Sequence, residues 1–171
     1  MEQAAIGIGG NVGSAELIIA RFAAALRAVA QWENTTLEAY SSIYKSAPWG
    51  DVNQPPFLNM AAMIKTEFGP GQILQRLKDL EVALGRIPGR RWGPREIDLD
   101  ILIFGSQLIQ LPGLTIPHPQ LLNRAFAALP LLEIWPDAVM PGGLAVSDAI
   151  SKQRHNWPPM ETHGELKLQG E

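Results

Sequence analysis

Apolar residues recur along this chain with two spacings, one typical of strands and one typical of helices. An apolar run over residues 4–8 ends in the glycine-rich stretch G-I-G-G-N-V-G-S and predicts a first strand followed by a turn. Residues 15–31 place apolar side chains at helical spacing, and Ser14 is a suitable N-cap. Residues 72–84 repeat the helical spacing. The chain therefore alternates between the two kinds of element.

Three further stretches have strand character, and they complete a recognisable order. Residues 36–44 and 59–66 predict a pair of strands, and a third apolar run follows residue 97. A short hairpin and a helix over residues 121–134, which contains Pro130, come after it. The order βαββαβ predicts an α+β protein with a ferredoxin-like antiparallel sheet, helices packed on it and a C-terminal helical extension.

Length and composition limit the class of protein. The 171 residues suit one domain, which we assign to residues 1–150, with a polar and loosely held tail over 151–171. The chain has no cysteine, which excludes a disulfide scaffold and thiolate metal sites. A net charge of −3 disfavours binding to nucleic acid through overall charge. Because no apolar run reaches the ~20 residues needed to cross a bilayer, we expect a cytoplasmic protein without membrane contact.

The stretch from residue 84 to residue 104 combines opposite charges in an unusual way. A loop with Arg86, Arg90, Arg91 and Arg95 leads directly into an apolar run that only two aspartates interrupt. Burying unpaired charge costs several kcal/mol or more, so a ligand between the two charge types is the economical interpretation. A polyphosphate with a divalent cation meets that need, because arginine holds phosphate oxygens and aspartate holds the metal.

The spacing of the two aspartates supports this interpretation. Residues two apart in a strand project from the same face, so Asp98 and Asp100 point together and the apolar residues beside them point away. Mg²⁺ takes one or two carboxylates and completes its shell with phosphates and water. The alternative is an exposed strand face with ordinary solvated acids, which the four upstream arginines make less attractive.

Two further stretches offer candidate binding residues. The loop S-A-P-W-G-D-V-N-Q-P-P-F-L-N carries Trp49 and Phe57, which serve either as a hydrophobic plug or as a shelf for a flat ligand, with Asn59 offering a donor and an acceptor to a heterocycle edge. His118 lies between two prolines that fix its backbone, and it is either structural or catalytic. The glycine-rich turn by itself predicts a tight turn more than a phosphate cradle.

Taken together, these motifs resemble a known family. The stretches G-I-G-G-N-V-G, P-W-G…Q-P-P-F-L-N, R-W-G-P-R-E-I-D-L-D-I-L-I-F-G and I-P-H-P…N-R-A-F-A are similar to those of 6-hydroxymethyl-7,8-dihydropterin pyrophosphokinases, in the same order, over about residues 4–140. The resemblance implies a monomer that transfers pyrophosphate from ATP to the hydroxymethyl group of the pterin and releases AMP in folate biosynthesis. It also implies two Mg²⁺ ions at Asp98 and Asp100.

The same resemblance implies roles for further residues. The pterin would lie between Phe57 and Phe126, and its edge would contact Asn59 and the segment with Ser46, Ala47 and Trp49. Catalytic positions correspond to Arg86, Arg91, Trp92, Arg95, Asp98 and Asp100. The ATP contacts correspond to Glu81, Arg86, Arg91, Trp92, Arg95, Ile101, Thr115, His118 and Arg124. Lys78 departs from the family, which often has glutamine there.

Three other functions remain open from the residues. A different magnesium-dependent phosphoryl or nucleotidyl transferase could share the paired aspartates, and release of ADP in place of AMP would distinguish it from the family. An RNA-binding module of ferredoxin-like fold lacks the expected aromatic residues on the sheet surface. A pterin-binding protein without turnover would use many of the same side chains. No nucleophile of the cysteine or G-x-S-x-G type is present, which favours catalysis by positioning and charge neutralisation.

Overall fold

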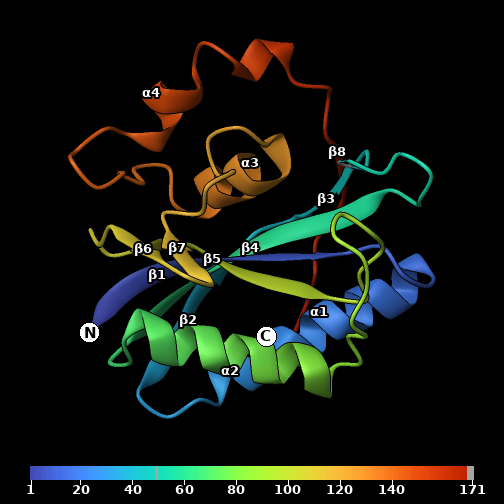
Figure 1. The fold of residues 1–171 in the computed structure, drawn as a ribbon, viewed down its shortest axis with the longest axis horizontal. Coiled ribbons are helices and arrows are strands. Elements are labelled where there is room, and N and C mark those ends of the chain that lie inside the picture. Colours follow the sequence, from blue (N-terminus) through green and yellow to red (C-terminus); the bar gives the residue numbers. More distant parts are fainter. Residues whose placement is uncertain (49, 169–171) are drawn as a thin grey trace.

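The computed structural model describes residues 1–48 and 50–168, and Figure 1 shows their arrangement. The first half contains β1 (Glu2–Gly10), α1 (Ala15–Ala30), β2 (Thr35–Tyr40), β3 (Ile43–Ser46), β4 (Phe57–Thr66) and α2 (Pro70–Ala83). The second half contains β5 (Asp98–Phe104), β6 (Ile109–Leu111), β7 (Leu114–Ile116), α3 (Ala125–Ile134), α4 (Val146–Ile150), a 3₁₀ turn (Arg154–Asn156) and β8 (Glu161–Gly164).

The main sheet confirms the predicted α+β class. Its strands run in the order β5-β1-β4-β3-β8, β2 also pairs with β4, and every pairing is antiparallel. A separate hairpin is formed by β6 and β7. In Figure 1, α1 and α2 lie on one side of the sheet and α3 lies on the other. Helix α3 packs mainly on β4, with further contacts to β3 and β1.

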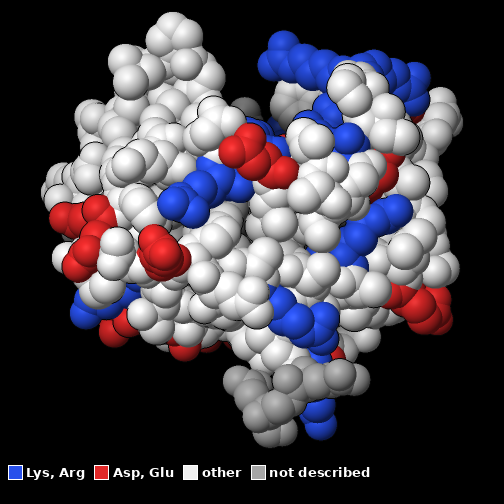
Figure 2. Space-filling model, turned by 90° about the horizontal axis from the view of Figure 1, so that it is seen from below, with Lys and Arg blue, Asp and Glu red and all other residues white. Residues whose placement is uncertain are grey.

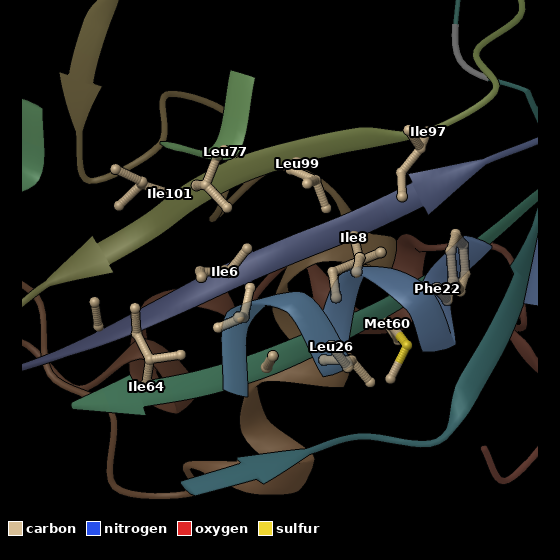
Figure 3. Packing of buried hydrophobic residues seen from close by; sticks show 14 of the residues in the cluster. Ile6, Ile8, Phe22, Leu26, Met60, Ile64, Leu77, Ile97, Leu99 and Ile101 are labelled. Atoms are coloured by element: carbon tan, nitrogen blue, oxygen red, sulfur yellow. The ribbon is translucent and has the colours of Figure 1, made fainter. Parts of the chain in front are cut away.

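The larger core fills the space between the sheet and the first two helices. Ile6 and Ile8 of β1 point toward Phe22 and Leu26 of α1, and Leu77 of α2 lies beside β5 (Figure 3). All five side chains are buried. Helix α1 begins where the sequence predicts, because the Ser14 hydroxyl accepts a hydrogen bond from Leu17 N at 3.2 Å. Alternation along β1 and β5 leaves the opposite face available for other contacts.

One predicted strand is divided in two. The sequence predicts continuous strand over 36–44, but β2 ends at Tyr40 and β3 begins at Ile43. Ser41 interrupts the ladder, because its N–H donates to Ala61 O at 2.8 Å and its hydroxyl accepts from Ala61 N at 2.9 Å. A side-chain oxygen thus takes a backbone position in the ladder, which an apolar–polar pattern does not reveal.

The helix predicted over 121–134 begins later, at Ala125. Turns with hydrogen bonds from Leu121 N to His118 O and from Asn123 N to Gln120 O precede it. Arg124 has an extended backbone with φ of −131°, which sets the start of α3. The helix then continues through Pro130 without ending.

The C-terminal segment differs from the expected loosely held tail. Strand β8 pairs with β3, so that residues 161–164 extend the main sheet. Leu166 follows it and is only 6% exposed in the larger core. All four residues of β8 are exposed, so its sequence is polar like that of a loop although its backbone is paired. Backbone pairing of this kind leaves little trace in hydropathy. Within residues 1–48 and 50–168, no helix is long and apolar enough to cross a membrane.

Candidate active site

A cavity of about 320 Å³ lies on the sheet face opposite α1 and α2. Its floor is β1, where Gly7 and Gly9 face the space while Ile6 and Ile8 face the core. A Cβ atom on Gly9 would lie 3.0 Å from Asn59 Oδ1, so a side chain there would crowd the cavity. The absence of side chains at these two positions therefore leaves room for a ligand.

The two candidate metal ligands lie on one wall of this cavity. Asp98 pairs with Gly9 and Asp100 pairs with Gly7 across the β1–β5 ladder. Both aspartates line the cavity, while Leu99 between them is buried in the larger core. The predicted separation of carboxylates and apolar residues onto opposite faces of this strand is therefore present.

Cations surround the two carboxylates. Arg86 Nη1 lies 2.7 Å from Asp98 Oδ1 and 2.6 Å from Glu81 Oε2. Lys78 Nζ lies 3.7 Å from Asp100 Oδ1 and 2.8 Å from Glu81 Oε1. Burial disfavours the charged form of Arg86, but the charges of Asp98 and Glu81 outweigh it and raise its pKa above the ordinary value. The aspartates that the sequence places on an apolar strand are thus neutralised by ion pairs within the protein.

The surroundings of Asp100 favour a bound cation. Burial raises the pKa of Asp100, the negative charge of Asp98 raises it further, and Lys78 and Arg86 oppose this change. Two neighbouring carboxylates that face one cavity fit the donor set that Mg²⁺ takes together with substrate phosphates. Residues 1–48 and 50–168 contain no cluster of three or more His, Asp or Glu side chains suited to a metal. A cation here would therefore depend on ligands from a substrate.

His118 and Arg124 form the side of the cavity nearest α3. His118 Nε2 lies 3.9 Å from Asp100 Oδ2, and its Nδ1 accepts a hydrogen bond from Gln120 N at 3.1 Å. With Nδ1 as the acceptor, Nε2 carries the proton and faces Asp100. Burial, and then the charge of Arg124, lower the pKa of His118. The imidazole is therefore held neutral, with its N–H directed at the carboxylate.

The β4 side of the cavity carries aromatic and amide side chains, and the Arg124 guanidinium lies 5.5 Å from the Phe126 ring centre. Phe57 and Phe126 both line it, from β4 and from the first turn of α3. Asn59 is 6% exposed, and its Nδ2 donates to Ser46 Oγ at 2.8 Å. Ala47 follows Ser46 along the rim. Aromatic side chains beside a fixed amide are suited to bind a planar ring with polar groups along its edge.

The arginine segment, residues 86–95, covers the cavity. Trp92 lies between two guanidinium groups, with Arg91 Cζ at 5.0 Å and Arg124 Cζ at 4.8 Å from its ring centre. Its φ of 63° is in the left-handed region, which is uncommon for a tryptophan. The segment is fastened at its end, because Arg95 N donates to Asn11 Oδ1 at 2.9 Å and Arg95 O accepts from Asn11 N at 2.9 Å. Arg90 forms an ion pair with Asp51 across the rim.

Most of the residues predicted from the sequence meet at this one cavity. Those that line it are Ser46, Ala47, Phe57, Asn59, Arg86, Arg91, Trp92, Arg95, Asp98, Asp100, His118, Arg124 and Phe126. Glu81 lies behind the wall and contacts Arg86. Ile101 belongs to the larger core on the opposite face of β5, and Thr115 is exposed on β7; the side chains of these two do not line the cavity. Trp49 lies outside the described residues.

Several cavity residues were not predicted. Gly9 was assigned to a turn and Gly7 was given no part in a site, although the alternation I-G-I-G has the period of a strand and could have placed both glycines on one face. Gln120 and Leu102 also line the cavity. Asn11, which is 1% exposed and is not among the lining residues, was also not predicted, because its partners Gln54, Pro55 and Arg95 come from distant parts of the sequence.

Figure 2 shows a face of the molecule on which basic and acidic side chains lie in several separate groups. Lys and Arg on this face do not form one continuous stripe of the kind that tracks a nucleic-acid backbone. The basic residues that argue for function are therefore those around the cavity.

Comparison with known proteins identifies the family. The family model described as 7,8-dihydro-6-hydroxymethylpterin-pyrophosphokinase (HPPK) matches residues 5–136. A 2-amino-4-hydroxy-6-hydroxymethyldihydropteridine pyrophosphokinase of Haemophilus influenzae is 40% identical over 152 residues, which are 89% of this chain and 93% of that protein. The enzyme of the same name from Aquifex aeolicus is 39% identical over 137 residues, 80% of this chain and 82% of that protein.

Solved structures agree on the fold. A crystal structure of wild-type Plasmodium falciparum HPPK-DHPS with SDX-DHP has a TM-score of 0.65 at 14% identity, and the match covers 92% of this chain and 45% of that one. An HPPK-DHPS in complex with substrates has a TM-score of 0.67 at 14% identity, with 91% and 46% covered. The chain thus spans less than half of the length of these two structures. From the family match and the relatives together, the chain belongs to the HPPK family and is an ATP-using pyrophosphokinase of folate biosynthesis.

Proposed function

We propose that this pyrophosphokinase holds 6-hydroxymethyl-7,8-dihydropterin over β1 and β4 and ATP along β5, so that the hydroxymethyl group meets the phosphates between Asn59 and Asp98. The register supports this arrangement, because Asn59 and Asp98 both pair with Gly9 from opposite sides of β1. The observation that carries the proposal is this cavity, to which β4 contributes Phe57 and Asn59 on one side of β1 and β5 contributes Asp98 and Asp100 on the other.

The pterin is assigned to the β4 side of the cavity. Its ring would stack between Phe57 and Phe126, and its polar edge would bond to Asn59, Ser46 and the backbone of Ala47. Support comes from the bond between Asn59 Nδ2 and Ser46 Oγ, which holds the amide in one orientation before a ligand arrives. Asn59 Oδ1 then faces the floor near Gly9 as an acceptor. Trp49 completes the predicted set for this side.

ATP and magnesium are assigned to the β5 side. Asp98 and Asp100 would hold two Mg²⁺ ions, which when bound supply positive charge to the phosphate oxygens. Arg91 and Arg95 from the arginine segment would bind the transferred phosphates, and Arg86 would exchange its bond to Asp98 for a phosphate oxygen. Trp92 would close over the bound nucleotide. The remaining ATP contacts predicted from the sequence are Glu81, Ile101, Thr115, His118 and Arg124.

The reaction transfers the β- and γ-phosphates together to the pterin. The pterin hydroxyl oxygen attacks the β-phosphorus of ATP, the bond from that phosphorus to the oxygen bridging the α- and β-phosphates breaks, AMP leaves, and the hydroxyl proton passes to solvent. We assign Asp98 to orient the hydroxyl, because it is the carboxylate in register with Asn59. The arginines stabilise the charge that develops on the transferred oxygens. Catalysis here rests on positioning and charge.

Product analysis tests the proposal. The protein is incubated with MgATP and the reduced pterin alcohol, and nucleotides are separated by ion-exchange chromatography. AMP and the pterin diphosphate in equal amounts are expected. ADP as the nucleotide product would point to another phosphoryl transferase, and pterin binding without any nucleotide product would point to a binding protein. The expectation of a monomer stays a prediction, which light scattering with and without substrates would test.

A further inference from the structure

The backbone of Leu99, the residue between the two aspartates, is held by side chains of α2. Strand β5 is at the edge of the sheet, with β1 on one side. On the other side, Leu99 N donates to Glu81 Oε1 at 2.7 Å and Leu99 O accepts from Lys78 Nζ at 3.0 Å. Helix α2 therefore does for Leu99 what a neighbouring strand would do.

Glu81 is committed to these contacts on both of its oxygens. Oε1 accepts from Leu99 N and from Lys78 Nζ, and Oε2 accepts from Arg86 Nη1. Its side chain is only 3% exposed. A carboxylate so deeply enclosed has little surface to offer a nucleotide, and it is costly to bury unless it is fully bonded. The contacts of Glu81 are thus those of a structural centre.

The two cations bound to Glu81 reach the two aspartates. Arg86 connects Glu81 to Asp98 at 2.7 Å, and Lys78 connects it to Asp100 at 3.7 Å. Both aspartates, and the peptide between them, are therefore tied to the same buried carboxylate. Helix α2 itself is docked by Leu77, which is fully buried beside β5 (Figure 3). The position of Asp98 and Asp100 thus depends on α2 as well as on the sheet.

We propose that Glu81 and Lys78 are positioning residues for the pyrophosphokinase reaction, which fasten the edge strand at Leu99 and so fix the placement of the Asp98 and Asp100 carboxylates. This assignment replaces a direct contact of Glu81 with ATP. It rests on the proposed function, since it matters to catalysis only if the two aspartates hold the cations there. Lys78 extends the arrangement to the carbonyl side of Leu99.

Amide hydrogen exchange at Leu99, measured by nuclear magnetic resonance on the ligand-free protein, tests the fastening without any turnover. In Glu81→Ala the Leu99 amide loses its acceptor, and we expect its exchange to accelerate about tenfold or more. Glu81→Gln keeps an acceptor oxygen and is expected to retain much of the protection. Asp79→Ala removes an exposed carboxylate of the same helix, which accepts a hydrogen bond from Gln75, and serves as the matched control.

Binding and rate measurements on the same variants separate positioning from nucleotide contact. Glu81→Ala is expected to lower kcat about 100-fold, because displaced carboxylates misalign the reacting groups, while the Kd for ATP without magnesium changes less than about threefold. Lys78→Met should lower kcat in the same direction and speed Leu99 exchange less. Glu81→Gln should recover at least about a tenth of the wild-type kcat.

Two results would overturn the proposal. One is unchanged Leu99 exchange in Glu81→Ala, and the other is a loss of ATP affinity that accounts for the whole loss of kcat/KM. A wild-type protein that forms no AMP would instead overturn the proposed function, and the exchange experiment would still decide whether Glu81 fastens the strand.

Discussion

Arg86 lies 2.7 Å from Asp98, and this ion pair connects the arginine segment to the strand that carries both candidate metal ligands. Arg86 is three-quarters buried, at 24% exposure, and its other contact is Glu81. In the ligand-free protein the guanidinium thus neutralises the carboxylate that a cation would later contact. Binding of the nucleotide with its cations would release Arg86 toward the phosphates.

Replacing Arg86 should therefore cost more in catalysis than in folding. Arg86→Ala removes a cation from the phosphate end, and we expect kcat to fall on the order of 100-fold. Steady-state kinetics with both substrates at saturation measure the change. Arg27→Ala, which removes an exposed arginine from the last turn of α1, is the control and should leave kcat unaltered. Equal effects of the two substitutions would show that Arg86 acts only through overall charge.

Arg95 offers a sharper separation of rate from affinity. Its backbone is held by two hydrogen bonds with Asn11, so Arg95→Ala should leave the end of the arginine segment in place. If its guanidinium acts on the transition state, kcat falls on the order of 100-fold while the Kd for ATP changes less than about threefold. Isothermal titration calorimetry and initial rates measure the two quantities. A loss confined to the Kd would assign Arg95 to ground-state binding.

Asn59 should affect the pterin and leave ATP unchanged. Asn59→Ala removes a buried amide held by Ser46, and the loss of one or two bonds to the pterin edge costs about 1–3 kcal/mol, or ~5- to 150-fold in Kd. Fluorescence titration with the pterin and calorimetry with ATP test the selectivity. Ser46→Ala should weaken pterin binding less, because it frees the amide without removing it. Parallel losses for both ligands would argue against the assigned seat.

The pH dependence of stability can be predicted at a site remote from catalysis. Glu133 of α3 accepts hydrogen bonds from Ser42 N at 2.9 Å, from the Ser42 hydroxyl at 2.8 Å and from the Tyr44 hydroxyl. Burial by itself raises the pKa of Glu133, but the bonds from Tyr44 and Ser42 outweigh it and lower the pKa below its ordinary value of 4.5. A lowered folded-state pKa means that the ionised carboxylate stabilises the fold above the ordinary pKa.

This contribution should be lost as pH falls through the folded-state pKa of Glu133. Because the residue is largely exposed, we expect Glu133→Gln to lower the free energy of unfolding by only about 1 kcal/mol at pH 7. The difference between the two proteins should shrink as the pH falls below 4.5 and through the folded-state pKa of Glu133. Urea denaturation at a series of pH values from 7 downward measures it. A difference that does not change with pH would show that the charge of Glu133 contributes nothing.

Much of the fold follows from residue spacing. The period of two over residues 98–101 placed both aspartates on one face, and the helical spacing over 15–31 gave α1 with Ser14 as its cap. The limits came where a side chain or a distant backbone replaces a regular contact. Ser41 divides a strand through its hydroxyl. Strand β8 is exposed and polar, and the sequence offers no alternation to predict it, although the apolar Leu166 that follows is buried in the core.

The site shows the same division. Arginines followed by aspartates on an apolar strand indicated a phosphate and metal site, because charged groups are costly to bury unless they are paired. The contact of Glu81 with the peptide of Leu99 could not be predicted, because it depends on the crossing of α2 over the sheet edge. Asn11 likewise bonds to two segments, at residues 54–55 and at Arg95, that only the fold brings together.

The most direct measurement is magnesium-dependent AMP formation by Asp100→Asn, which removes the charge and keeps the shape. With a circular dichroism spectrum like that of the wild type, this variant should lose at least about 1,000-fold in turnover at every magnesium concentration, because its candidate ligand no longer carries charge to the cation. The wild type should form AMP and pterin diphosphate in equal amounts. Near-normal AMP formation by Asp100→Asn would contradict the assignment of the paired aspartates as the metal seat.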